Sequence, residues 1–441
     1  MKKIFNIALL LITSLTLASC GGKQTLLFLN WGEYIDEDLI EQFEKEYNCT
    51  VQMDLGDSNE VFYSKVKSGT TVYDVVCPSD YMVEKMYNAN LLLELDSSKL
   101  DYNPNSSNIK KSVKNIISTM KENTDDSIEN YFVPYLSGTW GIMYTTKKEG
   151  LKDAILNNSN QWASLFDRTS LPEGTKVAMY ESNNHAYYAA CRYLGYNTLE
   201  ELPTSNLKVI ENLVRNMKYD AWGTDSIKKD IVRGNLDVGF MWTGDFLYYY
   251  AEQAAKTVVE AAKNGLSKDN VTLMLDTMIK NSTSYSLNGT SYSIGFDLFI
   301  PDDTIAFCDS LVIPKDSVHT DLAYKFINFM TSSSLTTKDG EELTPAFDNT
   351  NYVCYDSPYI DTYESMVNLQ NEEVFTEDDI NQAKTASSVD STSLYEKAYN
   401  YTVGAAFEKY YPKDEVKGTI LGAFGRHYVN EIGNSINNAR V

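Results

Sequence analysis

Two strand-and-helix pairs follow one another near the start of the chain, and this alternation restricts the possible folds most strongly. The stretch LLFLNWGEYIDEDLIEQFEKEY, residues 26–47, predicts a short buried strand, a break, and a helix with apolar residues on one face. TVQMDL then alternates as a strand, NEVFYSKVKSG predicts a short helix that stops at Gly69, and DVVC predicts another buried strand. The alternation predicts an α/β fold with a mostly parallel sheet covered by helices.

Length and charge restrict the domain count and the partners. A chain of 441 residues is too long for one ordinary core and predicts two or three domains. The formal net charge of −23 argues against a nucleic-acid partner, because phosphate binding needs clustered Lys and Arg. The same charge favours solubility and provides a field that attracts a cationic ligand.

The N-terminus predicts a lipoprotein signal peptide over residues 1–19. MKK is basic, and the apolar segment IFNIALLLITSLTLA is too short to favour a membrane span. LASC follows, and a small residue before a Cys resembles the bacterial lipobox, in which the Cys becomes a lipidated N-terminus. Cys20 is the candidate, with residues 20–23 as the anchored start of the mature chain; a plain secretory signal that contains a Cys is the alternative. The lipid predicts a location on the outer face of the bacterial cytoplasmic membrane, or in the periplasm.

Cysteine and histidine do not predict a metal site, a cofactor or an enzyme. The five cysteines after Cys20 have neither metal-ligand nor disulfide-framework spacing, so we expect most of them to be small buried residues. They are Cys49, Cys77, Cys191, Cys308 and Cys354. Only three histidines are present, and the chain has no phosphate-binding loop, no nucleophile elbow and no zinc-binding HExxH motif.

Aromatic and polar or acidic residues recur where the predicted strands end. Ligands of open parallel sheets bind beyond the carboxyl ends of the strands. Aromatic faces attract a cation, and carboxylates accept its charge-assisted hydrogen bonds, so this combination predicts an ammonium-binding cleft. The candidate residues are Trp31, Glu33, Tyr34, Ser79, Tyr81, Trp242, Asp245, Phe307, Asp309 and Tyr355.

Six motifs give the chain a family resemblance. They are LNWGEYI, YDVVCPSDYMVEKM, PYLSGTWGI, QWASLFD, VGFMWTGD and AFCDSLVIPKD. In this order they resemble the bacterial spermidine/putrescine-binding proteins, the solute-binding components of polyamine ABC importers. The resemblance covers most of residues 25–250 and 295–360, and then the closing segment LGAFGRHYVNEI. It assigns the ten strand-end residues to the cleft of the family. The WTGD segment is similar to the putrescine-binding branch, in which the Asp contacts an amine.

The resemblance implies a periplasmic-binding-protein-like fold: two α/β lobes, each a mostly parallel sheet flanked by helices, with a hinge and a ligand cleft between them. Lobe 1 would hold residues 24–136 and 307–362, and lobe 2 would hold residues 137–306 and 363–441. YFVPYLSGTWGIMY is a plausible crossing between them. Residues 254–293, rich in Lys, Ser, Asn and Thr, are expected to be an insertion in lobe 2.

The chain departs from the family pattern before LGY. The family places amine-binding carboxylates at positions that here hold Ser182 and His185, and only Glu181 lies nearby. These three residues are therefore a second, separate group of candidates for ligand binding, and fewer carboxylates favour a short diamine such as putrescine over spermidine. A His185 side chain that faces the ligand would titrate near ~6.5, so acid would weaken cation binding.

The sequence thus predicts a monomeric, lipid-anchored solute-binding protein that captures a polyamine and delivers it to the permease subunits of an ABC importer. A protein of the same fold for another organic cation is the first alternative. A secreted carbohydrate-active enzyme is the second, favoured by acidity and aromatic content. The third is an adhesin or sensor lipoprotein that uses the predicted insertion as its contact surface.

Overall fold

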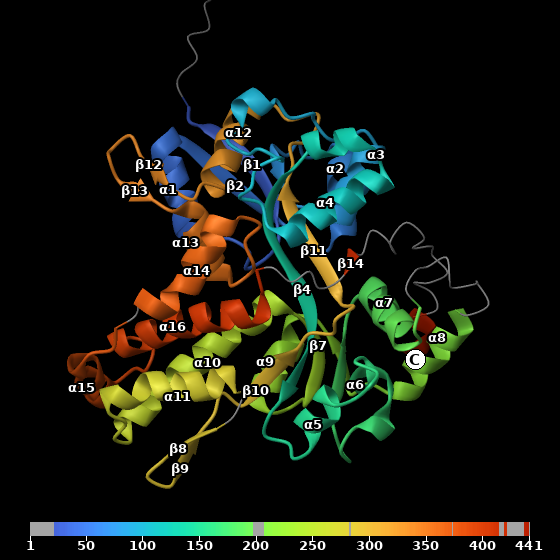
Figure 1. Cartoon of the computed structure of the whole chain (residues 1–441). Coiled ribbons are helices and arrows are strands. Elements are labelled where there is room, and N and C mark those ends of the chain that lie inside the picture. The colour runs from blue at the N-terminus through green and yellow to red at the C-terminus, as the bar shows by residue number, and fades with distance from the viewer. Residues whose placement is uncertain are drawn as a thin grey trace, which may run out of the picture.

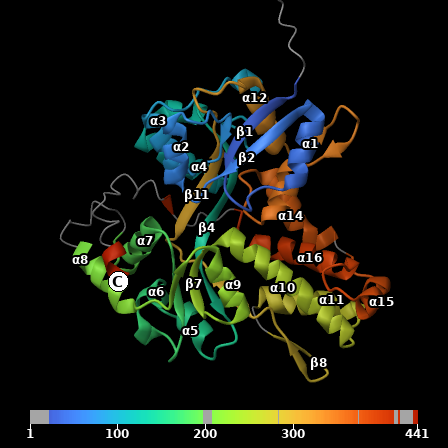
Figure 2. The same ribbon diagram turned by 180° about the vertical axis from the view of Figure 1, so that it is seen from behind.

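The fold is known from a computed structural model that describes residues 22–196, 207–281, 284–372, 374–413, 419–420 and 436–440. The signal peptide, Cys20 and the segment LGAFGRHYVNEI therefore lie outside the described residues. Figures 1 and 2 show two lobes, each with a sheet and covering helices. Among the described residues, no helix combines the length and the apolar character that crossing a membrane requires.

The first lobe is built on the predicted strand–helix alternation. Its parallel sheet has the order β2-β1-β3. The strands are β1 (Gln24–Asn30), β2 (Cys49–Leu55) and β3 (Val75–Val76). The helices of this lobe are α1 (Glu37–Tyr47), α2 (Asn59–Ser68), α3 (Asp80–Asn88), α4 (Lys111–Asn123), α12 (Thr320–Met330) and α13 (Pro345–Val353), and a small hairpin joins β12 (Leu335–Thr336) and β13 (Glu342–Leu343).

Local signals in the sequence set the ends of these helices. The Asp36 carboxylate accepts a hydrogen bond from the Asp38 backbone at the start of α1, and the Ser58 hydroxyl caps α2 in the same way. Gly69 ends α2 in the left-handed conformation, φ 63°, which glycine adopts without strain. The predicted stop at Gly69 is thus confirmed.

The second sheet has the order β14-β11-β4-β7-β5-β6, with β10 also paired to β4. Its strands are β4 (Val133–Thr145), β5 (Val177–Tyr180), β6 (Ala221–Gly223), β7 (Val238–Trp242), β10 (Phe296–Phe299), β11 (Ile305–Leu311) and β14 (Thr419–Ile420). The pairs β5–β6, β5–β7 and β11–β14 are parallel, whereas β4 runs antiparallel to β7, β10 and β11. The expected parallel sheet is thus interrupted by β4.

Helices that pack against this sheet or against one another complete the second lobe. They are α5 (Leu151–Leu156), α6 (Ala163–Phe166), α7 (Asn183–Tyr193), α8 (Leu207–Met217), α9 (Asp225–Arg233), α10 (Thr243–Lys263), α11 (Lys268–Lys280), α15 (Glu377–Thr385) and α16 (Ser393–Tyr410). In Figure 1, α14 (Ile360–Glu372) lies between these helices and the first lobe.

Strands β4 and β11 run from one lobe into the other (Figures 1 and 2). The first half of β4 pairs with β11, where Gly138 faces Phe307, and the second half pairs with β7, where Trp140 faces Trp242. A Cβ on Gly138 would lie 2.9 Å from the Phe307 ring, so glycine allows that close packing. The proposed lobe boundaries fall inside β4, β11 and α14, which makes these continuous elements the candidate hinge.

The segment 254–293, expected to be an insertion, does not form a separate surface unit. Its first half completes α10 and forms α11, and both helices pack against α16. Their apolar residues, such as Ala255, Val258 and Met274, are fully buried in the second lobe. Only the hairpin of β8 (Tyr285–Leu287) and β9 (Thr290–Tyr292) projects from the lobe in Figure 1. The first half of the segment is therefore part of the core of the second lobe, and its status as an insertion stays a prediction.

Candidate functional site

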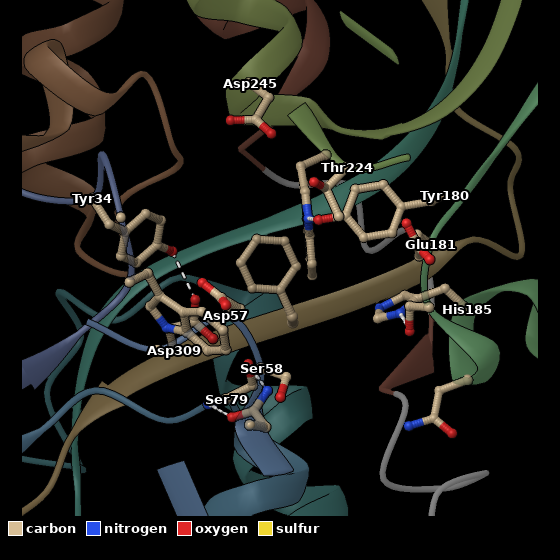
Figure 3. A pocket seen from close by; sticks show the side chains of 18 of the residues that line it. Tyr34, Asp57, Ser58, Ser79, Tyr180, Glu181, His185, Thr224, Asp245 and Asp309 are labelled. Carbon is tan, nitrogen blue, oxygen red and sulfur yellow. Dashed lines mark hydrogen bonds between the residues drawn. The ribbon is translucent and has the colours of Figure 1, made fainter. Parts of the chain in front are cut away.

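The carboxyl ends of β1, β2, β3, β5, β6 and β7, together with the middle of β11, surround a cleft with a cavity volume of about 660 Å³ (Figure 3). All ten candidates line it, and so do Glu181, Ser182 and His185. The ten are Trp31, Glu33, Tyr34, Ser79, Tyr81, Trp242, Asp245, Phe307, Asp309 and Tyr355. The expectation that all ten follow strand ends is wrong for three of them, because Phe307 and Asp309 lie inside β11 and Tyr355 follows helix α13. The common location of the candidates follows from the fold; that they bind a ligand stays a prediction.

The loop after β1 contributes one half-buried, one exposed and one buried side chain. Trp31 donates its indole N–H to the Cys77 carbonyl over 2.8 Å and packs on Phe62, with the ring centroids 4.4 Å apart. Glu33 is exposed at the rim and adopts φ 54°. Tyr34 is buried and points its hydroxyl into the cleft. The aromatic residues are therefore fixed as walls, whereas Glu33 is an accessible anion.

Asp309, on β11, is the most buried anion with an unused hydrogen-bonding position in the cleft. Its Oδ2 accepts the Tyr34 hydroxyl over 2.8 Å (Figure 3), while its buried Oδ1 has no partner with hydrogen-bond geometry among the described residues. Burial raises the pKa of Asp309 to about 6, although the hydroxyls of Ser79 and Tyr34 oppose this rise. A buried carboxylate with one unsatisfied oxygen is suited to accept a hydrogen bond from an ammonium group.

The start of α3 is held next to Asp309 by short-range polar contacts. The Asn59 side-chain N–H donates to the Ser79 hydroxyl over 2.9 Å, and the Ser79 backbone N–H donates to Asn59 Oδ1 over 3.0 Å. Asp80 accepts the backbone N–H groups of Tyr81 and Cys308, and burial raises the pKa of Asp80 to about 8. Ser79 and Tyr81 therefore have fixed positions, and Asp80 has a structural role behind them.

A chain of aromatic rings forms the floor of the cleft. The Trp242 centroid lies 3.9 Å from that of Trp140 and 4.7 Å from that of Phe307. The Phe307 centroid lies 6.1 Å from that of Tyr355, and the Tyr355 centroid lies 4.9 Å from that of Tyr34. These rings offer apolar surface for methylene groups and ring faces for a cation.

Asp245 has a partner that sequence analysis missed. The Lys228 ammonium, on α9, lies 3.1 Å from Asp245 Oδ1 and 3.3 Å from Asp225 Oδ1. The Lys228 side chain is only 3% exposed, and the two carboxylates raise its pKa against the effect of burial. Burial raises the pKa of Asp245, and Lys228 opposes that rise. The carboxylate predicted to be an amine ligand is therefore already in an ion pair.

His185 does line the cleft, but its predicted titration is wrong. Its Nδ1 forms a hydrogen bond of 2.6 Å with the Ser182 hydroxyl, and its ring lies 4.2 Å from that of Trp140. Burial lowers the pKa of His185 to about 3, because no neighbouring carboxylate compensates for the lost hydration. His185 therefore remains neutral at pH 5.5. The nearby Glu181 is exposed and lies 3.3 Å from Arg440, so it too has a cationic partner.

The cleft includes residues that sequence analysis did not select. Most of them follow the carboxyl ends of β2, β5 and β6, where strand-end reasoning applies equally. The residues after β2 have no aromatic residue directly beside them that would have marked them, whereas Tyr180 ends and Asp225 follows a strand too short to stand out in the sequence. The missed residues are Asp57, Ser58, Asn59 and Glu60 after β2, Tyr180 at the end of β5, and Thr224, Asp225 and Lys228 after β6.

The cleft is strongly anionic. Its carboxyl groups belong to Glu33, Asp57, Glu60, Asp80, Glu181, Asp225, Asp245 and Asp309, against the single cation Lys228 among its described lining residues. Elsewhere in the described part of the chain, as in the cleft, no three His, Cys, Asp or Glu residues are grouped to hold a metal ion. The five described cysteines are all buried, as expected.

Two α/β lobes with an aromatic, acidic cleft at the strand ends define a binding protein of the periplasmic type. The sequence model of the bacterial extracellular solute-binding proteins matches residues 29–335. The chain belongs to this family.

Similar proteins support the same assignment. The chain is 29% identical to the putrescine-binding periplasmic protein SpuD of Pseudomonas aeruginosa, over 71% of this chain and 75% of that protein. It is 26% identical to the putrescine-binding periplasmic protein PotF of Escherichia coli, over 73% and 77%. The crystal structure of the spermidine/putrescine substrate-binding protein PotD of Streptococcus pneumoniae shares the fold, with a TM-score of 0.55, 22% identity, and 95% and 100% of the two chains covered.

Proposed function

We propose that this protein captures a polyamine outside the cell and delivers it to the permease of an ABC importer, without catalysing a reaction. One observation carries the proposal: the buried Asp309 carboxylate has an unsatisfied oxygen in a cleft walled by aromatic rings. An ammonium group satisfies that oxygen, and the rings of Trp242 and Phe307 cover the methylenes that follow it. The names of SpuD and PotF agree with such a ligand.

The ligand we favour is a short diamine such as putrescine. Asp309 provides one deep anion, and Glu33, Asp57 and Glu60 provide exposed anions on the same side of the cleft. The positions that hold Ser182 and His185 bring no carboxylate to the opposite side, and His185 is neutral. Fewer available anions suit two ammonium groups better than three, because an unpaired ammonium in a closing cleft is disfavoured.

Isothermal titration calorimetry of the purified protein with putrescine, spermidine, agmatine and choline tests this proposal. We expect putrescine to bind most tightly and choline, which cannot donate a hydrogen bond from nitrogen, to bind weakly or not at all. Tight binding of a different organic cation with no binding of either polyamine would replace the ligand class. Turnover of a glycan without cation binding would favour the enzyme alternative instead.

We also propose that Cys20 carries the lipid that holds the protein at the outer face of the cytoplasmic membrane. The support is the LASC motif and the signal-like segment before it. Membrane fractionation compares wild type with Cys20→Ala, which should appear in the soluble fraction with unchanged polyamine affinity. A variant that stays in the membrane fraction after a high-salt wash would contradict the lipobox assignment.

A further inference from the structure

The carboxylates of the cleft fall into two groups that differ in their partners. The lobe 1 carboxyl groups are those of Glu33, Asp57, Glu60, Asp80 and Asp309, and within the described residues none of them forms an ion pair. Asp80 instead accepts two backbone N–H groups. The lobe 2 carboxylates are Glu181, Asp225 and Asp245, and each lies within 4 Å of a cation of the chain itself. Figure 3 shows Asp309 and Asp245 on different sides of the cleft.

Lys228 forms ion pairs with two carboxylates of the second group, Asp225 and Asp245. It is the fourth residue of α9, one turn after Asp225, and Asp245 lies in the first turn of α10. Both carboxylates therefore occupy the positive ends of helices, and the lysine ammonium links those ends. The Tyr249 ring lies 5.7 Å from the same ammonium. The ammonium thus has two carboxylates and a ring as neighbours, which is the environment an amine ligand needs.

A ligand ammonium that approached Asp245 would meet a like charge. Lys228 Nζ is 3.1 Å from Asp245 Oδ1, so a second ammonium on that carboxylate would lie within roughly 6 Å of the lysine. Like charges this close repel strongly in a cleft that excludes water. Three charged groups, Asp225, Asp245 and Lys228, also leave this side with a single net negative charge.

We propose that Lys228 is a specificity-determining residue. Its ammonium takes the place of a ligand amine between Asp225 and Asp245, so the cleft accepts a diamine from the lobe 1 carboxylates and disfavours a triamine that needs an anion on both sides. This inference rests on the proposed polyamine function and adds the residue that sets chain length.

Calorimetry with putrescine and spermidine on Lys228→Met tests the inference. The substitution keeps the length of the side chain and removes its charge, which leaves Asp225 and Asp245 for a ligand ammonium. We expect spermidine affinity to rise about tenfold or more, with a much smaller change for putrescine. Lys228→Arg, which keeps the charge, should retain the wild-type preference. Lys229→Met is the matched control, because Lys229 is adjacent in the chain but does not line the cleft.

A double variant separates the effect of the freed charge from the effect of the altered side chain. Adding Asp245→Asn to Lys228→Met removes one of the two freed carboxylates while the Met side chain remains, so most of the gain in spermidine affinity should be lost. If Lys228→Met does not fold, as judged by thermal unfolding, Lys228→Gln carries the same expectation with retained hydrogen bonding. A folded, charge-removed variant with unchanged or weaker spermidine binding would overturn the inference while putrescine binding by wild type still supports the function. Absence of all polyamine binding by wild type would instead refute the proposed function.

Discussion

The two sides of the cleft use the same residue types in opposite ways. On the lobe 1 side, Asp309 is buried next to Tyr34 with one oxygen unsatisfied. On the lobe 2 side, Asp245 sits beside the buried ammonium of Lys228. A carboxylate without a partner in its own chain is stabilised when it binds a cation. A carboxylate that is already paired within the chain gains little stabilisation from a second cation. Acidic residues in a binding cleft therefore have to be assessed together with their internal partners.

The largest effect is expected from Asp309→Asn. The side chain keeps its shape and its contact with Tyr34 but loses its charge, so polyamine binding should weaken by about 2 kcal/mol, roughly thirtyfold. Titration calorimetry with putrescine measures it. Asp316→Asn, a substitution on the exposed surface beyond β11, is the control and should bind as wild type does. An unchanged dissociation constant in Asp309→Asn would remove the distinction between the two sides.

A smaller effect is expected from pH. A pKa of about 6 leaves Asp309 mostly charged at pH 7.5 and mostly protonated at pH 5.0. A cation binds the charged form, so affinity should fall about tenfold as the pH decreases through 6. The free energy of unfolding of the unliganded protein should respond to pH in the opposite direction. The raised pKa of Asp309 contributes stability at low pH, and this contribution is lost as the pH rises through 6. Calorimetry at the two pH values measures the binding effect.

The same pair of pH values on Asp309→Asn is the control for that experiment. The variant has no carboxyl group at this position, so its weaker affinity should change little between pH 7.5 and 5.0. A pH response of full size in the variant would assign the titration to a group other than Asp309.

Asp245→Asn should have a still smaller effect on putrescine binding. Lys228 already neutralises much of the Asp245 charge, so we expect a loss of about threefold, well below that of Asp309→Asn. The substitution also leaves Lys228 with Asp225 alone, so the melting temperature should decrease. Binding and thermal unfolding measured on both variants compare the two sides directly. Equal losses in the two variants would mean that the internal ion pair does not protect Asp245 from a ligand.

The sequence was sufficient to locate the part of the cleft that is built from strand ends. Strand ends such as those before Trp31 and Ser79 follow from hydrophobic pattern, and the carboxyl ends of parallel strands meet by geometry. The Tyr34–Asp309 hydrogen bond joins residues 275 positions apart, and its existence depends on β11 crossing between the lobes. No local pattern contains that information.

The partners of the lobe 2 carboxylates were harder to predict. Lys228 lies three residues after Asp225, a spacing that predicts a neighbour on a helix, but this pair looks like many surface pairs. Only the packing of α9 against α10 brings Lys228 to Asp245. The buried state of residues 254–280 was missed for a similar reason, because polar residues on the outer faces of α10 and α11 dominate the composition. Tertiary packing decided both cases.

His185→Gln is expected to have the smallest effect. His185 fills a buried position between Ser182 and the Trp140 ring, and burial holds its pKa at about 3. It carries no charge between pH 5.0 and 7.5, so it neither repels a cation nor contributes to the pH response. Glutamine keeps a hydrogen-bonding group toward Ser182, and putrescine affinity should change by less than about twofold. Calorimetry at pH 5.0 and 7.5 should give the same pH response in the variant and in wild type. A response that disappears in His185→Gln would show that this imidazole titrates, and would assign the acid sensitivity to the lobe 2 side in place of Asp309.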